Sequence, residues 1–451
     1  MRVLSIILLV RSVFCGVGAD YHVGPGHDLA DPNEVAWEAL RAGDRIFIHA
    51  RQEPYRSKFV LCCRGTEQAP IRVIGVKDRE GRRPVLDGKG ALTRKQLNFW
   101  GEARAVIKIG GANRPSDVVP GFIEVHGLEV RGGRKPNSFM GREGRTGYAR
   151  NAAAFYVEKG EHLLIEDCVI RDNGNGIITA PATRDLVVRG CHLFDNGVEG
   201  SLYEHNAYTT GIDVRFEFNR FGPLRPACLG NNFKDRSAGL SFRCNWVEGG
   251  NRCLDLVDAA DAKILGHPLY RRTLVWGNVM WKTPGPGNNQ VIHYGGDSGD
   301  LGRYRGGTLR LWNNTIVSLR SGNTVLVRPS ERECRIECRQ NIAHVVREDG
   351  RLFLLADAAE LEAEGNWFSL GWQGVVGENL AAGADNASGT APGFVDWRVG
   401  DLRLRSDSPL RRSIEKVLPP EGFGADGAEW QYRSHQDRSP RAAWTVPGAF
   451  E

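Results

Sequence analysis

The sequence contains few methionines, no long hydrophobic run and no strongly basic segment. There are 3 Met among 451 residues, and no segment approaches the roughly eighteen consecutive apolar residues of a membrane-spanning helix. The formal net charge is only +5, and no block of lysine and arginine resembles a nucleic-acid-binding arm. We therefore expect no membrane span and no nucleic acid partner.

The sequence also lacks paired metal-binding cysteines. Its 10 cysteines are scattered through strand-like segments, without CxxC pairs or a histidine at zinc spacing. We expect most of them to be small buried hydrophobic residues, and we predict no metal site. Glycine, by contrast, is abundant: 56 residues indicate many turns between short strands and disfavour a compact helical fold.

Residues 1–19 have the pattern of a secretory signal peptide. Arg2 precedes a mostly apolar run over 3–10, and the small residues Gly-Val-Gly-Ala at 16–19 are typical of a cleavage site, although Arg11 interrupts the apolar stretch. The segment is too short to anchor the chain in a bilayer. We therefore predict a periplasmic or secreted protein.

One helix is predicted near the beginning of an otherwise β-rich chain. Residues 32–40 place apolar side chains on one helical face, and Gly43 follows as a stop signal. Short strands separated by turns follow over 44–88. Such a helix would cover the exposed end of a stack of strands.

From about residue 160 one polar or small residue recurs after each short strand, at intervals of 23 to 36 residues. The recurring positions are Cys168, Cys191, Asn219, Asn245, Asn278, Asn314, Asn341 and Asn366. No ten-residue helical pattern lies between the strands, so each interval is one rung of a parallel β-helix, with rungs about 4.8 Å apart. We expect each asparagine to adopt the left-handed conformation and to pair its amide with its neighbours in a ladder.

The predicted fold is therefore all-β, a single-stranded parallel β-helix with an N-terminal capping helix. We expect an N-terminal cap and the first rungs over 20–115, the β-helix over 116–370, and a C-terminal cap and tail over 371–451.

The chain resembles the pectate-lyase-like, right-handed parallel β-helix superfamily over most of residues 20–415. Segments 21–26, 43–48 and 84–88 resemble the N-terminal cap and first rungs of chondroitinase-B-like proteins, and segment 393–410 resembles their closing segment. The resemblance implies the fold and the right-handed coil. It leaves the reaction open, because the superfamily includes lyases, hydrolases, epimerases and noncatalytic adhesins.

Titratable residues are concentrated on consecutive rungs. Counted from the recurring turn position, His205, Lys234, Asp255 and His293 would lie on neighbouring strands of one face. Four rungs span roughly 15 Å, which suits a chain of sugars. We predict a groove that binds an acidic polysaccharide, most simply as a monomer.

Cleavage of a uronate chain by β-elimination needs a cation, a base and an acid. The like charge of Arg236 would favour a neutral Lys234 as the base, with Arg236 holding the substrate carboxylate, and His205 is the competing base. Tyr208 and Tyr294 are candidate acids. The predicted catalytic residues are His205, Lys234, Arg236 and Asp255, and the predicted substrate-binding residues are Tyr208, Arg252, His293 and Tyr294.

The resemblance to chondroitinase-B-like lyases implies a strand lysine as base, an arginine as acid and acidic calcium ligands. Lys234 matches the lysine, but segment 255–257 holds no arginine, Arg252 being the nearest, and segment 226–231 holds no carboxylate. We therefore predict no cofactor, and calcium stays an open alternative whose expected acidic ligands are not seen in the sequence. The motifs His205-Asn-Ala-Tyr208 and Lys234-Asp-Arg236 also resemble uncharacterised bacterial β-helix repeat proteins.

Three alternative functions remain open on the same scaffold. A C5-epimerase would share proton abstraction with the lyase. An inverting glycoside hydrolase would use two carboxylates about 6.5–9.5 Å apart. A noncatalytic glycan-binding or surface protein would use the same groove. The carboxylates available to a hydrolase are Asp213, Asp235, Asp255 and Asp258.

Overall fold

The computed structural model describes residues 18–114, 117–284, 287–331, 333–375, 385–412, 430–441 and 446–450. The predicted signal peptide lies outside the described residues except for Gly18 and Ala19. Within the described ranges, no helix has the length and apolar character needed to cross a membrane.

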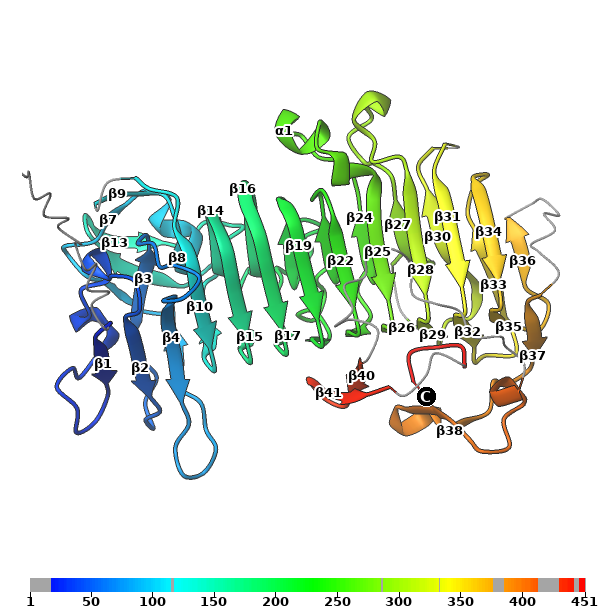
Figure 1. Cartoon of the computed structure of the whole chain (residues 1–451), viewed down its shortest axis with the longest axis horizontal. Coiled ribbons are helices and arrows are strands. Elements are labelled where there is room, and N and C mark those ends of the chain that lie inside the picture. Colours follow the sequence, from blue (N-terminus) through cyan, green and yellow to red (C-terminus); the bar gives the residue numbers. More distant parts are fainter. Residues whose placement is uncertain are drawn as a thin grey trace, which may run out of the picture.

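Short parallel strands stack into one elongated solenoid (Figure 1), whose rungs contribute to three columns. The first column consists of β1 (Asp20–Val23), β2 (Arg45–His49), β4 (Ile71–Val76), β10 (Gly121–His126), the second halves of β14 (Ala153–Glu166) and β16 (Asn175–Arg189), β19 (Ile212–Glu217), β22 (Leu240–Arg243), β25 (Arg272–Trp276), β28 (Thr308–Trp312), β31 (Arg335–Arg339) and β34 (Glu360–Glu364).

The second column forms a sheet of its own. It consists of β5 (Val85–Asp87), β11 (Glu129–Arg131), β15 (Val169–Arg171), β17 (His192–Phe194), β20 (Arg220–Phe221), β23 (Trp246–Glu248), β26 (Val279–Lys282), β29 (Thr315–Ser318), β32 (Ile342–Val345), β35 (Trp367–Ser369) and β37 (Ala387–Gly389).

The third column is joined to the first because β14 and β16 run unbroken through both. It consists of β3 (Ser57–Leu61), β8 (Ala105–Ile109), the first halves of β14 and β16, β18 (Ala207–Thr209), β21 (Phe233–Asp235), β24 (Leu254–Leu256), β27 (Gln290–Tyr294), β30 (Gly322–Pro329), β33 (Gly350–Leu355) and β36 (Gln373–Val375). The predicted parallel β-helix is thus confirmed.

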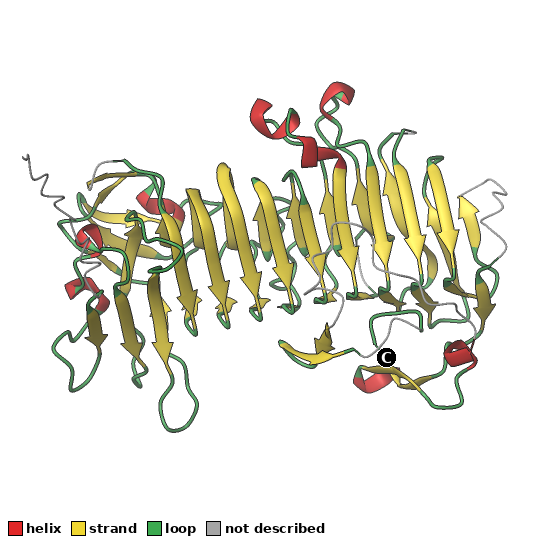
Figure 2. Ribbon diagram, viewed as in Figure 1, coloured by secondary structure: helices red, strands yellow, loops and turns green. Residues whose placement is uncertain are grey.

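The remaining elements are short and lie at the ends or edges of the columns (Figure 2). They are β6 (Leu92–Thr93), β7 (Asn98–Phe99), β9 (Ala112–Arg114), β12 (Ser138–Gly141), β13 (Gly144–Gly147), α1 (Ala262–Leu265), and the 3₁₀ turns η1 (Pro32–Glu34), η2 (Trp37–Ala39), η3 (Glu102–Arg104), η4 (Pro268–Arg271), η5 (Leu301–Arg303), η6 (Trp397–Val399) and η7 (Pro409–Arg412).

The core is built from stacked side chains of neighbouring rungs. Parallel pairing in register places Phe216 over Phe242, and Phe233 packs 4.9 Å and 4.8 Å from them between ring centroids. Such aromatic contacts stabilise the fold beyond the contribution of the buried apolar area. The nine described cysteines are free, and all but Cys228 are buried, which confirms their expected role as small hydrophobic residues.

The asparagine ladder lies between the first and second columns, as predicted. Asn278 is representative: its Nδ2 donates to Oδ1 of Asn314 at 2.9 Å, and its own Oδ1 accepts from N and Nδ2 of Asn245 at 2.8 and 3.1 Å. The left-handed conformation, however, belongs to the preceding residue, for example Cys244 with φ 50°. The side chain of the ladder asparagine must point inward, so the backbone changes direction at the residue before it.

The predicted capping helix over 32–40 is wrong: two 3₁₀ turns, η1 and η2, replace it. Val35 between them is extended, with φ −67° and ψ 132°. This break lets Trp37 stack on Phe59 with 3.8 Å between ring centroids and donate from Nε1 to the Pro32 carbonyl at 2.8 Å. The free energy gained by burying one large aromatic side chain outweighs the tendency of the amphipathic pattern to form a helix.

The C-terminal segment folds back along the outer side of the second column instead of extending the stack (Figure 1). It contains β38 (Phe394–Asp396), β39 (Asp401–Leu404), β40 (Trp430–Arg433) and β41 (Asp437–Pro440). Tyr432 and Phe450 pack against Trp246 and Ile342 there. The described residues of this segment leave the outer face of the third column uncovered.

Replacement of a ladder asparagine should destabilise the fold. Asn278→Ala would leave the buried Phe242 carbonyl and the Asn245 amide without their hydrogen bonds, and we expect a loss of about 3 kcal/mol in the free energy of unfolding, measured by urea denaturation. The control Asn323→Ala removes an exposed side chain of β30, and it should change stability by less than about 0.5 kcal/mol. Equal effects of the two substitutions would contradict a stabilising ladder.

Candidate active-site groove

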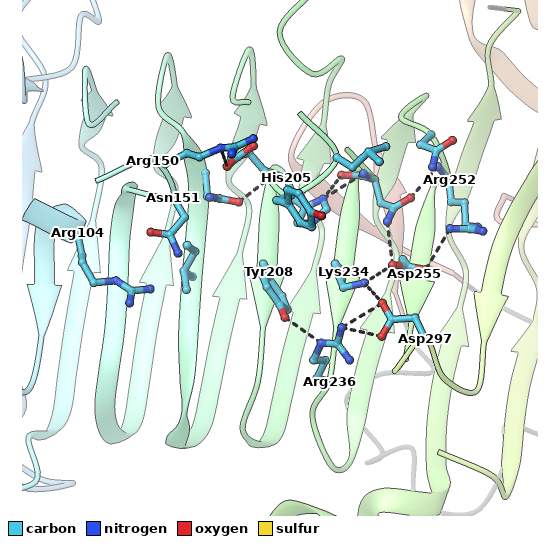
Figure 3. A pocket seen from close by; sticks show the side chains of 17 residues that line it. Arg104, Arg150, Asn151, His205, Tyr208, Lys234, Arg236, Arg252, Asp255 and Asp297 are labelled. Atoms are coloured by element: carbon cyan, nitrogen blue, oxygen red, sulfur yellow. Dashed lines mark hydrogen bonds and ion pairs between the residues drawn. The ribbon is translucent and has the colours of Figure 1, made fainter. Parts of the chain in front are cut away.

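A groove of about 740 Å³ lies over the third column at β16, β18, β21 and β24 (Figure 3). Its lining combines cationic, acidic, amide and aromatic side chains. The cations are Arg104, Arg150, Lys234, Arg236 and Arg252, and the carboxylates are Glu204, Asp255 and Asp297. The cations outnumber the carboxylates, so the lining favours an anionic ligand.

The pairing register aligns the central residues of the groove. Tyr208 pairs with Lys234, Lys234 with Asp255, and Asp255 with His293, on four successive strands. The residues before them, such as Phe233 and Leu254, are fully buried in the core. The prediction that Lys234, Asp255 and His293 share one face of neighbouring rungs is therefore confirmed.

Asp255 is the centre of a buried hydrogen-bond network. Its Oδ2 accepts from Lys234 Nζ at 2.6 Å and from Asn231 Nδ2 at 2.8 Å, and its Oδ1 lies 2.7 Å from His293 Nδ1. Burial alone would raise the pKa of Asp255, but the hydrogen bond from His293 and the charge of Lys234 outweigh it and hold the pKa well below 3.8. Asp255 is therefore a fixed anion.

Asp297, which the sequence analysis did not identify, connects the other cations. It lies in the loop after β27, where its amide donates to Asp258 Oδ1 at 2.7 Å. Its carboxylate accepts from Arg236 at 2.7 and 3.0 Å and from Lys234 at 2.6 Å. Burial raises the pKa of Asp297, yet the two cations lower it overall. Arg236 also donates from Nε to the Tyr208 hydroxyl oxygen at 2.8 Å.

The surroundings of Lys234 differ from those on which its role as a base was predicted. Its Nζ lies 2.6 Å from both the Asp255 and the Asp297 carboxylates. Arg236, whose like charge was the reason for that prediction, is itself paired with Asp297. Lys234 is therefore suited to binding an anion or to positioning Asp255, and it is poorly suited to removing a proton.

His205 lies on the groove wall just before β18. Its backbone amide donates to Asn175 Oδ1 at 2.8 Å, and its Nδ1 lies 3.0 Å from both the N and the O of Asn231. This leaves Nε2 as the ring nitrogen available to a ligand. Burial and the positive charge of Lys234 lower the pKa of His205 to about 4, so the imidazole is neutral near pH 7.

The other predicted residues are placed differently. Arg252 lines the groove, with one guanidinium nitrogen 3.5 Å from Asp255. His293 lies behind Asp255 and supports it, since its Nε2 lies 2.7 Å from Ser330 Oγ. The expectation that Tyr294 binds substrate is wrong: its side chain is buried, and its hydroxyl donates to the Gly306 carbonyl at 2.7 Å. Successive side chains of a strand point to opposite faces, so Tyr294 must point inward when His293 points outward.

The carboxylates proposed for a hydrolase do not form a pair in the groove. Asp235 is fully buried and forms an ion pair of 2.8 Å with the fully buried Arg305. Asp258 is buried beneath Asp297, and Asp213 is a half-buried residue of β19 with a left-handed backbone, φ 55°. Of these candidates only Asp255 lines the groove.

Two buried polar groups in the groove lining have no hydrogen-bond partner within the described chain. Both carboxylate oxygens of Glu204 are buried, and the nearest cation, Arg150 Nε, is 3.7 Å away. Nδ2 of the fully buried Asn175 is likewise unpaired. Buried polar groups are normally hydrogen-bonded, so an unpaired acceptor and an unpaired donor at one groove indicate a polar ligand rich in hydroxyl groups.

The groove does not fit a calcium ion. Calcium binds roughly six to eight oxygen ligands, and these include carboxylates that are not already paired with a cation. The carboxylates of Asp255 and Asp297 are already neutralised by Lys234 and Arg236, whose ammonium and guanidinium groups occupy the space beside them.

Comparison with known proteins supports the fold. No protein-family model and no curated protein matches the chain. Among solved structures, pectate lyase Pel9A is 13% identical with a TM-score of 0.51, over 89% of this chain and 92% of that chain. An alginate lyase from Paenibacillus sp. strain FPU-7 is 12% identical with a TM-score of 0.46, over 73% of this chain and 94% of that chain.

The match to the pectate lyase confirms the predicted resemblance at the level of fold: the chain has a parallel β-helix of the pectate-lyase-like kind. At this identity the likeness concerns the fold alone. The chemistry must therefore be inferred from the groove itself.

The buried His205 should make stability fall in mild acid. The unfolded chain protonates this histidine below pH 6.5, whereas the folded chain keeps it neutral down to about pH 4. Between these values the unfolded state binds more protons, so the free energy of unfolding decreases as the pH falls. His205→Gln should reduce this loss by about 3 kcal/mol, measured by urea denaturation across the interval.

The same titration can be followed directly by NMR of the imidazole protons. The His205 resonance should remain that of a neutral ring down to about pH 4. A titration of this ring near pH 6.5 in the folded protein would contradict the assignment.

Proposed function

We propose that this protein binds an acidic, uronate-containing polysaccharide in the groove and cleaves it by β-elimination. The observation that carries the proposal is a neutral imidazole, His205, whose ring contacts the Tyr208 ring in a groove lined by five cations. The two rings meet edge to face, with 5.6 Å between centroids. A base and an acid on one wall suit removal of a proton and expulsion of a leaving group on the same side of a sugar.

His205 is the base in this proposal. Nδ1 lies 3.0 Å from both the carbonyl and the amide of Asn231, and the proposal takes the tautomer in which Nδ1 donates to the carbonyl. In that tautomer Nε2 carries the lone pair that accepts the C5 proton of the uronate. The nearby Lys234 charge lowers the pKa of the free imidazole. A bound substrate carboxylate offsets that charge, so His205 becomes a stronger base when the substrate is present.

Tyr208 is the acid. As the C5 proton moves to His205, the C4–O bond breaks, a C4=C5 double bond forms, and the Tyr208 proton passes to the departing oxygen. The guanidinium of Arg236, which donates to the Tyr208 oxygen at 2.8 Å, stabilises the phenolate that remains. Proton exchange with water then restores both residues.

Cations at the groove hold the substrate carboxylates. Arg236 and Lys234 are compensated by Asp297 and Asp255, whereas the Arg150 side chain is 61% exposed, lies 3.7 Å from Glu204 and donates to the Ser201 hydroxyl at 3.2 Å. Arg104, on η3, lies over the Tyr156 ring at 4.4 Å from its centroid. These two arginines are the groove cations best placed to bind further uronates along the chain.

A glycoside hydrolase is the second candidate, favoured by Glu204. A buried carboxyl group facing the groove without a hydrogen-bond donor resembles the environment of a glycosidase acid. Reducing ends released without an unsaturated product would support this reading over the lyase. Inversion at C5 without cleavage would indicate an epimerase, and binding without any product would indicate a noncatalytic glycan-binding protein.

The proposal includes export to the periplasm or the medium, because large acidic polysaccharides lie outside the cytoplasm. Residues 1–19 would provide the signal. The groove is formed by one chain, so a monomer is sufficient.

Activity should depend on both proposed proton-transfer groups. On a panel of alginate, pectate and glycosaminoglycans, we expect ultraviolet absorbance from an unsaturated uronate with at least one substrate. His205→Ala and Tyr208→Phe should each lower kcat by about 10²–10⁴-fold. Tyr21→Phe, on β1 far from the groove, is the matched control and should be unaffected. Full activity of the Tyr208→Phe variant would exclude Tyr208 as the acid.

The groove arginines should act mainly on substrate binding. Arg104→Ala and Arg150→Ala should each raise KM about tenfold, which corresponds to about 1.4 kcal/mol, with a smaller change in kcat. The control Arg351→Ala removes an exposed arginine of β33 on the same column. An unchanged KM in both groove variants would place the substrate elsewhere.

A further inference from the structure

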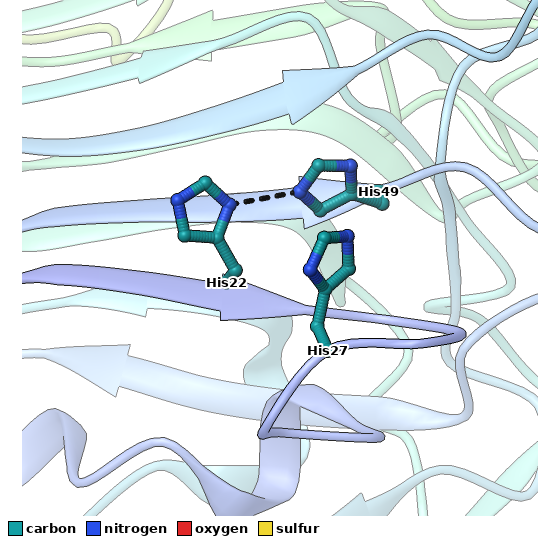
Figure 4. A group of neighbouring side chains, drawn as sticks. All are labelled: His22, His27 and His49. Atoms are coloured by element: carbon teal, nitrogen blue, oxygen red, sulfur yellow. Dashed lines mark hydrogen bonds between the residues drawn. The ribbon is translucent and has the colours of Figure 1, made fainter.

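Three histidines lie together at the N-terminal end of the first column, far along the solenoid from the groove (Figures 1 and 4). His22 lies on β1, His49 is the last residue of β2, and His27 lies in the turn that follows β1. His22 Nδ1 lies 3.0 Å from His49 Nε2, and one nitrogen of each ring lies within 4.8 Å of the others.

The surrounding backbone holds the three rings together. The pairing of β1 with β2 places His22 beside Phe47, on which it stacks with 4.8 Å between centroids. The following turn is closed by hydrogen bonds from Gly24 N to Leu29 O and from His27 N to Gly24 O. It brings the His27 ring to 3.9 Å from the His49 ring between centroids.

The turn requires glycine at its beginning. Gly24 has φ +137°, and a Cβ atom there would lie 3.1 Å from His49 Cβ and 2.8 Å from the Tyr55 hydroxyl. The close approach of the turn to β2, which carries His27 over His49, is therefore built into the backbone.

We propose that His22, His27 and His49 bind a divalent late transition metal ion, such as Zn²⁺, through three imidazole nitrogens. Metal–nitrogen bonds of about 2.0–2.1 Å in tetrahedral geometry place two ligand nitrogens about 3.3 Å apart, close to the separation of His22 and His49. His22 and His27 are exposed, so small side-chain rotations bring the third nitrogen into range. The fourth position faces solvent and is available to water.

The chemistry of the cluster favours a late transition metal ion. Neutral imidazole is the form that binds metals. All three ligands are nitrogens, which selects zinc, copper or nickel over calcium and magnesium. A bound ion would fasten the turn after β1 to β2 at the N-terminal end of the stack.

The test uses the full chain without a histidine tag, stripped with a chelator, and isothermal titration with Zn²⁺, Cu²⁺ and Ca²⁺ near pH 7. We expect one saturable site for Zn²⁺ or Cu²⁺, no binding of Ca²⁺, and a rise in Tm on saturation. His27→Ala and His49→Ala should weaken binding at least about tenfold. The control His267→Ala removes a half-buried histidine that caps η4 in another segment, and this variant should bind normally.

If copper binds but zinc does not, and copper binding is lost in the same variants, the result would support the site and assign copper as its metal. Absence of saturable binding by both metals, or unchanged affinity in both cluster variants, would overturn the proposal. His27 lies in an exposed turn, so its replacement by alanine is not expected to unfold the chain, and circular dichroism of each variant verifies this.

Discussion

The turn between the first and second columns is the constraint on which the molecule depends. From Asn219 to Asn366, each rung reverses direction at a left-handed residue and then places an asparagine inward, whose amide binds the rungs on either side. Because the turn is the same on successive rungs, the strands cannot slip by one residue without exposing the core. The alignment of Tyr208, Lys234 and Asp255 across three strands is a direct result.

Charge compensation then divides the groove into two parts. Around Asp255 and Asp297 the cations are fully paired and mostly buried, so this part is rigid and needs little reorganisation when a ligand binds. Toward β16 the pairing is incomplete, since Arg150 is largely exposed and Glu204 has no hydrogen bond. His205 lies where the two parts meet, between a fixed network and an open binding surface.

The sequence predicted those features that repeat. The ladder positions followed from the rung period, and counting from them placed His205, Lys234 and Asp255 on neighbouring rungs, although the turns between differ in length. Asp297 could not be found this way, because it lies in a loop whose path no period determines. Without Asp297, one of the two carboxylates that contact Lys234 was missed.

Errors of one residue account for most of the other differences. Tyr294 and His293 are adjacent, and only the structure decides which faces outward. The left-handed residue precedes the ladder asparagine instead of coinciding with it. At the N-terminus, a local amphipathic pattern over 32–40 was overridden by the packing of Trp37 on Phe59. The three histidines likewise converge only through a turn that no periodicity predicts.

The C-terminal segment changes how the stack behaves as a repeat protein. In a simple solenoid each rung touches only its neighbours, so end rungs can unravel independently. Here Gln436 bonds to the Gly190 carbonyl, Ala449 to Thr315, and Gly448 to the Gln340 carbonyl. Residues 436–449 thus tie together rungs that precede them by many residues, so the middle of the solenoid reaches its full cooperativity only after this segment has been synthesised.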